Sequence, residues 1–80
     1  MDHFITQEVA GKVAAAILES GISKRSVSEA AGIPATTFGR KIKGHVEFTF
    51  SELIRIAEVI GVKPSEFTPT AFDARIGVAA

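Results

Sequence analysis

Four short amphipathic stretches, each followed by a glycine, constrain most strongly how this 80-residue chain folds. In the first stretch apolar side chains recur every four residues, at Ile5, Val9, Val13 and Ile17. This is the spacing of one face of an α-helix. The glycines that follow the four stretches are Gly21, Gly32, Gly44 and Gly61. Because no stretch has the length or alternation of a convincing strand, the pattern predicts an all-α fold, a compact bundle of four to five short helices.

Capping signals place the ends of these helices. Thr6, Ser23 and Thr49 are suitable N-caps, and Glu52, three residues after Thr49, completes a capping box. Pro34 suits the first turn of a helix, where its missing N–H is no loss. The expected helices span about residues 6–20, 24–31, 34–43 and 50–60, with a short fifth helix at 64–67.

Two finer expectations concern packing. Gly11 lies inside the first helix, where glycine costs about 1 kcal/mol relative to alanine, so close packing is expected there. In the second helix Val27, Ala30 and Ala31 are expected to point inward.

Charge is unevenly distributed along the chain. Nine Lys and Arg balance nine Asp and Glu, and such neutrality alone argues against a nucleic-acid partner. The segment from Ile22 to Val46, however, holds five cations and one acid, a net +4, which leaves −4 for the remainder. The five cations are Lys24, Arg25, Arg40, Lys41 and Lys43. The segment is expected to offer a surface for phosphate, although on charge alone a solvated patch without a partner remains open.

Several function classes are excluded by composition. The chain has no cysteine, and His3 and His45 have no further ligands at a suitable spacing, so no metal site is expected. No phosphate-binding loop or nucleophile–base pair is present, so we expect no enzyme, no catalytic residue and no cofactor. The longest apolar run, residues 13–18, is too short to span a membrane. A cytoplasmic protein, nucleoid-associated or in a host-cell cytoplasm, is expected.

The helix expected at residues 34–43 has two distinct faces. Phe38 and Ile42 are four residues apart and define its buried side. The opposite side carries small or hydroxyl residues first and cations later: Ala35, Thr36, Gly39, Arg40 and Lys43. Small residues let the backbone approach another surface closely, as when a helix enters the major groove of DNA. The alternative is that Gly39 packs against the fourth helix or the preceding loop.

Two short helices joined by a turn with Gly32 and the apolar Ile33 have the spacing of a helix-turn-helix. The stretch from Gly21 to Gly44, together with residues 53–62, resembles the lambda-repressor-like (XRE/Cro/CI) helix-turn-helix family over about residues 6–67. The run from Gly32 to Gly44 is most similar to repressors of actinobacteria and their phages. The resemblance implies sequence-specific binding of an operator in double-stranded DNA by a transcriptional regulator, a phage immunity repressor or Cro protein. The DNA-binding domain would span residues 1–70, and residues 71–80 would be a tail or linker stub.

The resemblance also implies roles for single residues. The base-reading positions of the family correspond here to Ala35, Thr36, Thr37 and Arg40. Ser23 and Lys24 match the family's phosphate anchor, although many members have glutamine where Lys24 stands. Ala35 replaces the usual polar reader and is limited to contact with a thymine methyl group.

Other roles follow from charge and helix position. Arg40 is expected to bind a guanine through two hydrogen bonds, with a phosphate contact as the alternative. Arg25, Lys41 and Lys43, with Lys24, are expected to contact phosphates. His45 either adds a phosphate contact or lies free in a loop, and the alternative role of Thr37 is to cap its helix.

Two questions of assembly stay open. The alternative to a DNA-binding domain is a protein-interaction or antitoxin-like module on the same bundle, but the 34–43 face lacks the large apolar anchors that such an interface needs. A homodimer on DNA is the second open question. The candidate contacts are Phe67, Phe72, Ile76 and Val78, and the alternative is that they close the chain's own core.

Overall fold

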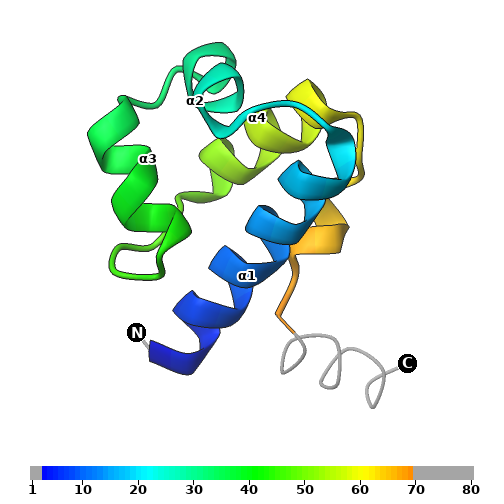
Figure 1. Cartoon of the computed structure of the whole chain (residues 1–80). Coiled ribbons are helices and arrows are strands. Elements are labelled where there is room, and N and C mark those ends of the chain that lie inside the picture. The colour runs from blue at the N-terminus through cyan, green and yellow to red at the C-terminus, as the bar shows by residue number, and fades with distance from the viewer. Residues whose placement is uncertain (1–2, 70–80) are drawn as a thin grey trace.

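The computed structural model describes residues 3–69. It contains four α-helices and one short 3-10 helix (Figure 1): α1 (His3–Ser20), α2 (Lys24–Ala31), α3 (Ala35–Ile42), α4 (Phe50–Ile60) and η1 (Pro64–Phe67). Within this described range no strand is formed. The predicted all-α fold is therefore confirmed.

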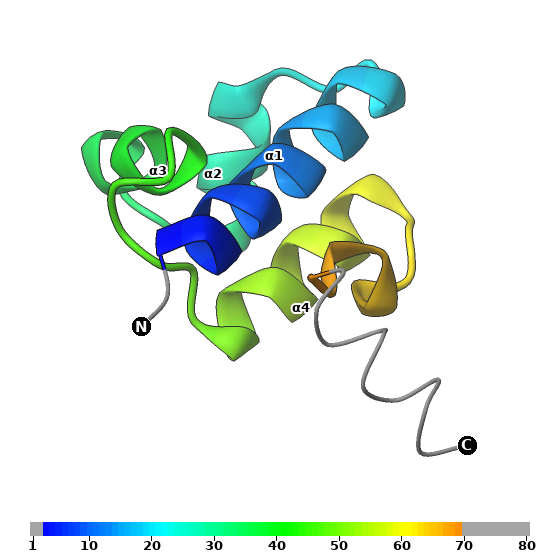
Figure 2. The ribbon, with the colours of Figure 1, turned by 90° about the horizontal axis from the view of Figure 1, so that it is seen from below.

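The helices form two layers around a small core. In Figure 1 α1 and α4 run in a similar direction across the view, and the perpendicular view in Figure 2 shows the two helices at different depths. Helix α2 packs on α4 and α3, α1 packs on α3 and α4, and η1 packs on both α1 and α4. In both views α3 lies at the side of the molecule opposite η1. This arrangement leaves one long face of α3 at the surface.

The core gathers apolar side chains from all five elements and from the turn before α3. Its buried members are Val13, Ile17, Val27, Ala31, Ile33, Phe38, Ile56, Ala57 and Phe67. The ring of Phe38 meets that of Phe48 edge to face, with centroids 6.0 Å apart. Phe67, only 1% exposed, closes the chain's own core. The other three candidate dimer contacts lie outside the described residues.

The capping signals predicted most helix ends correctly. The bounds of α2 and α4 are those expected, and the capping box of Thr49 and Glu52 is formed. Helix α1 begins at His3, so the expectation of Thr6 as its N-cap is wrong. Helix α3 is one residue shorter at each end than predicted. Pro34 has a ψ of 140° and is its N-cap, since the extended ψ keeps it outside the helix.

Two packing expectations are wrong. Gly11 is exposed, and a Cβ built there would meet no atom within 4 Å, because α1 buries its other side. Ala30 is also exposed. The buried face of α2 instead includes Ser28, whose Oγ donates to the carbonyl oxygen of Arg25 at 2.9 Å. The eight-residue helix has room for one narrow buried face only, so the position two residues after Ser28 points outward.

Candidate nucleic-acid interface

Local hydrogen bonds hold both ends of α2 and the turn that joins it to α3. Ser23 precedes the helix, and its Oγ accepts the N–H of Ser26 at 3.1 Å, which satisfies one otherwise unpaired donor. Gly32 follows the helix with a φ of 73°, a left-handed conformation that side chains with a Cβ disfavour. The N–H of Ile33 then donates to the carbonyl oxygen of Ser28 at 2.9 Å. The predicted helix-turn-helix geometry is formed.

Helix α3 presents most of the predicted reading residues to solvent. Ala35, Thr36 and Arg40 are exposed, and Thr37 is half-buried. The N-cap of α3 makes no side-chain hydrogen bond. A Cβ built on Gly39 would meet no atom within 4 Å, so the alternative that Gly39 packs against α4 or the loop is wrong. The structure thus leaves an open surface over Gly39 for another molecule.

An open hollow of about 550 Å³ separates α2 from α3 on this side of the molecule. Lys24, Arg25 and Glu29 line it from α2, so that wall has a net charge of +1, and Ala35 and Gly39 line it from α3. The small side chains of Ala35 and Gly39 leave the hollow wide on the α3 side. The cations that line it, Lys24 and Arg25, both lie on the α2 side. The hollow therefore combines positive charge with a surface that a second molecule can approach closely.

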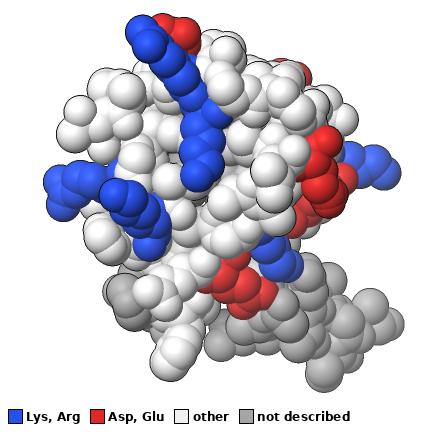
Figure 3. Space-filling model, in the orientation of Figure 1, with Lys and Arg blue, Asp and Glu red and all other residues white. Residues whose placement is uncertain are grey.

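Exposed cations lie on both helices of this pair. Figure 3 shows Lys and Arg side chains over α2 and α3, with most acidic atoms on other parts of the same view. Lys24, Arg25, Arg40 and Lys43 are all exposed. Arg25 lies 3.8 Å from a carboxylate oxygen of Glu29, but both side chains are more than two-thirds exposed, so this ion pair contributes little.

Lys41, the fifth cation of the segment, is placed differently from the other four. It is only 6% exposed, and its Nζ lies 2.5 Å from Oε1 of Glu52 in α4. The surface on which the other cations lie does not include this ammonium group. The structure therefore corrects the expectation that Lys41 contacts phosphate, because its charge is engaged inside the protein.

The remaining predicted phosphate contacts lie at the two ends of the helix pair. Ser23 is exposed, although its Oγ already caps α2 and bonds the hydroxyl of Ser26 at 2.9 Å. His45 is exposed in the loop after α3, and its backbone N–H donates to the carbonyl oxygen of Arg40 at 3.0 Å. Both positions stay predictions as phosphate contacts.

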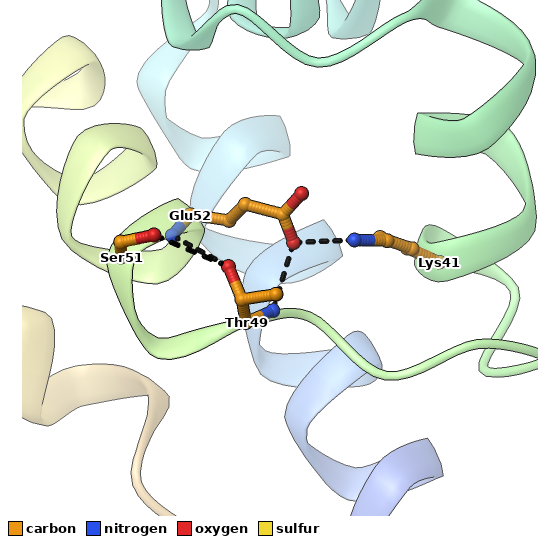
Figure 4. Close-up of polar contacts among 4 residues, drawn as sticks. All are labelled: Lys41, Thr49, Ser51 and Glu52. Carbon is orange, nitrogen blue, oxygen red and sulfur yellow. Dashed lines mark hydrogen bonds and ion pairs between the residues drawn. The ribbon is translucent and has the colours of Figure 1, made fainter.

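Glu52 lies near the site, although the sequence predicted it only as a member of the capping box at the start of α4. Its Oε1 accepts both the ammonium of Lys41 and the backbone N–H of Thr49, the latter at 2.8 Å (Figure 4). Burial raises the pKa of this carboxyl group, but hydrogen bonds from Lys41 and Thr49 and the nearby charge of Lys41 outweigh it, and the pKa is lowered. The only sequence signal for the pairing was Lys41 lying next to Ile42 on the buried side of α3.

Neither a cluster of possible metal ligands nor a membrane-spanning helix is found among the described residues. Residues 4–69 contain no group of three His, Asp or Glu side chains placed to hold a metal ion. None of the helices described is long and apolar enough to cross a membrane.

A comparison with protein families gives the family of this chain. A model of the Cro/C1-type HTH DNA-binding domain matches residues 13–70, which is more than half of the chain. The chain belongs to this family. The match includes α2, the turn and α3. It identifies this part of the chain as a DNA-binding domain of the kind used in transcription regulation. No curated protein and no solved structure gives a significant match to this Cro/C1-type chain.

Proposed function

We propose that this chain regulates transcription by binding a specific operator sequence, which it reads in the major groove with α3. The observation that supports this most is the exposed face of α3, where small and hydroxyl residues precede Arg40 beside an open hollow. A helix with this surface fits between the phosphate backbones and brings its first residues to the base edges. The protein would act in the cytoplasm, where its operator DNA would lie.

Base reading is assigned to Ala35, Thr36, Thr37 and Arg40. Arg40 has the length and the two-pronged donor geometry for the O6 and N7 atoms of guanine. Phosphate contacts are assigned to Lys24, Arg25 and Lys43, with Ser23 and His45 at the edges. Because three Lys and Arg side chains are assigned to phosphates, the logarithm of the binding constant should fall with the logarithm of the salt concentration with a slope of about −2.7 per copy.

The finer identity that we propose rests on the resemblance of the sequence run between Gly32 and Gly44. We take the protein to be a repressor of the phage immunity or Cro type, with its DNA-binding domain in residues 1–70 and a tail or linker in 71–80. Two copies would bind palindromic half-sites whose centres lie about 34 Å, one turn of DNA, apart. Sedimentation with and without the selected duplex would separate one copy from two.

The decisive experiment is selection of bound duplexes from a random pool at two salt concentrations. We expect one enriched sequence and a steep loss of affinity for unselected DNA as salt rises. Arg40→Ala should weaken binding of the enriched duplex by about 1–3 kcal/mol and leave binding of a scrambled duplex much less changed. Arg55→Ala, an exposed arginine of α4, is the matched control and should alter neither.

A protein-interaction or antitoxin-like module is the second candidate. The observation in its favour is that three large apolar side chains are exposed on α1 and α4: Phe4, Leu18 and Phe50. None of the three belongs to α3, so such a partner would not need the helix-turn-helix surface. Absence of any enriched duplex, with only weak binding at low salt, would refute DNA reading and favour this candidate.

A further inference from the structure

The recognition helix α3 carries a charged side chain that does not reach its exposed surface. The side chain of Lys41 is 8% exposed and that of its partner Glu52 is 13% exposed. Burying both charges costs solvation that the ion pair recovers only partly, so a pair of this kind is weak evidence for a gain in stability. Another role for the pair therefore has to be considered.

The pair joins two elements that otherwise hardly touch. Helix α3 packs on α1 and α2 but makes little contact with α4. Glu52 lies in the first turn of α4, and its Oε1 also accepts the N–H of Thr49 at 2.8 Å. The Oγ1 of Thr49 in turn accepts the N–H of Glu52 at 3.1 Å (Figure 4). Through this single carboxylate the capping box of α4 becomes the anchor for the last turn of α3.

The anchor lies next to the residues that matter for binding. Lys41 directly follows Arg40 and precedes Lys43 by two positions, in a helix of only eight residues. The other end of α3 is already held by the turn, in which Ile33 is buried. An eight-residue helix measures about 12 Å, so a small tilt at its C-terminal end shifts the side chains of its last turn directly.

We propose that Lys41 and Glu52 are positioning residues for DNA reading, which set the tilt of α3 and do not contact DNA. This inference rests on the proposed function and assigns to its site two residues outside the reading surface. The pair acts through Arg40, whose two hydrogen bonds to a base require a fixed direction of approach. Contacts with phosphates tolerate a small tilt, because Lys and Arg side chains on the surface are long and flexible.

The test compares two lysines of the same helix region, Lys41→Met and Lys43→Met. Binding of the selected and the scrambled duplex is measured at several salt concentrations, and thermal unfolding checks that each variant is folded. Lys41→Met should lower affinity for the selected duplex about tenfold, leave that for the scrambled duplex unchanged and keep the salt slope. Lys43→Met should weaken both and reduce the slope by about 0.9.

A second variant keeps the inference testable if Lys41→Met does not fold. Glu52→Gln retains an oxygen that accepts the N–H of Thr49 but removes the negative charge opposite Lys41. It should also reduce affinity for the selected duplex only, and combined with Lys41→Met the losses should be less than additive.

Two results would overturn the inference. A lower salt slope and equal losses on both duplexes for Lys41→Met would show that Lys41 contacts phosphate. Unchanged binding in a folded Glu52→Gln variant would show that the pair has no part in reading. If the unmodified protein selects no duplex, the proposed function itself fails, and that result is obtained before any variant is made.

Discussion

Replacing Gly39 with alanine should separate the stability of the fold from the affinity of the proposed interface. Gly39 lies inside α3, its φ is not positive, and a Cβ there would meet no atom within 4 Å. The new methyl group therefore costs nothing inside the protein. It would, however, project from the helix beside the hollow where DNA is proposed to lie.

The size of both effects follows from this geometry. Alanine is about 0.8–1.0 kcal/mol more favourable than glycine in a helix interior, so Gly39→Ala should increase the free energy of unfolding by about that amount. In a domain of this size such a gain raises Tm by roughly 4–8 °C. If DNA lies close against the backbone, an extra methyl group should cost about 1–3 kcal/mol of binding free energy, which is a loss of at least about fivefold.

Gly11→Ala is the matched control. Gly11 is also a helical glycine with open space around it, but it lies in α1 and does not line the hollow. Both variants should raise Tm in thermal unfolding, and only Gly39→Ala should bind the selected duplex more weakly in a titration. Equal affinities for the two variants would refute close approach of DNA at Gly39, and a lower Tm for Gly39→Ala would refute the open space around it.

Three further outcomes concern the fold itself. Phe67→Ala should lower the free energy of unfolding by about 3–5 kcal/mol in urea titration, because the side chain is buried in the core; a loss below about 1 kcal/mol would contradict that placement. Thr49→Ala removes the oxygen that caps α4 and should cost about 1 kcal/mol in the same assay, whereas no change would mean that the capping bond adds nothing. The pKa of Glu52 is lowered in the folded state, since hydrogen bonds from Lys41 and Thr49 outweigh its burial, so the unfolded chain binds the proton more tightly. Its contribution to stability should be complete above about pH 4.5 and be lost as the pH falls through the lower folded value, and Glu52→Gln should flatten this part of the profile.

Local signals in the sequence were sufficient for most of the fold. The ends of α2 and α4 are set by residues within one turn of them, Ser23 and Gly32 for α2 and Thr49 for α4, so they can be read without knowledge of the partners. The start of α1 was missed because Thr6 resembles an N-cap although the helix continues to His3 on its N-terminal side. A favourable capping residue allows a helix to begin but does not require it.

In the candidate site, local signals predicted the exposed face of α3 but not the ion pair of Lys41 with Glu52. The exposed face of α3 was predicted from helical spacing, because Phe38 and Ile42 define the buried side. Lys41 was grouped with the surface cations because of its charge, although its place next to Ile42 puts it on the buried side of α3. The partner that decides its position, Glu52, lies eleven residues away in another helix, and only packing of the two helices brings them together.

The uneven distribution of charge gives this neutral protein an electric dipole. The electric field around DNA exerts a torque on such a molecule before contact and turns the side with α2 and α3 toward the phosphates (Figure 3). The acidic remainder is repelled, so collisions in a wrong orientation are suppressed. Added salt should therefore slow the association rate even though the protein as a whole carries no net charge, and the rate of dissociation should depend more on the contacts made by α3.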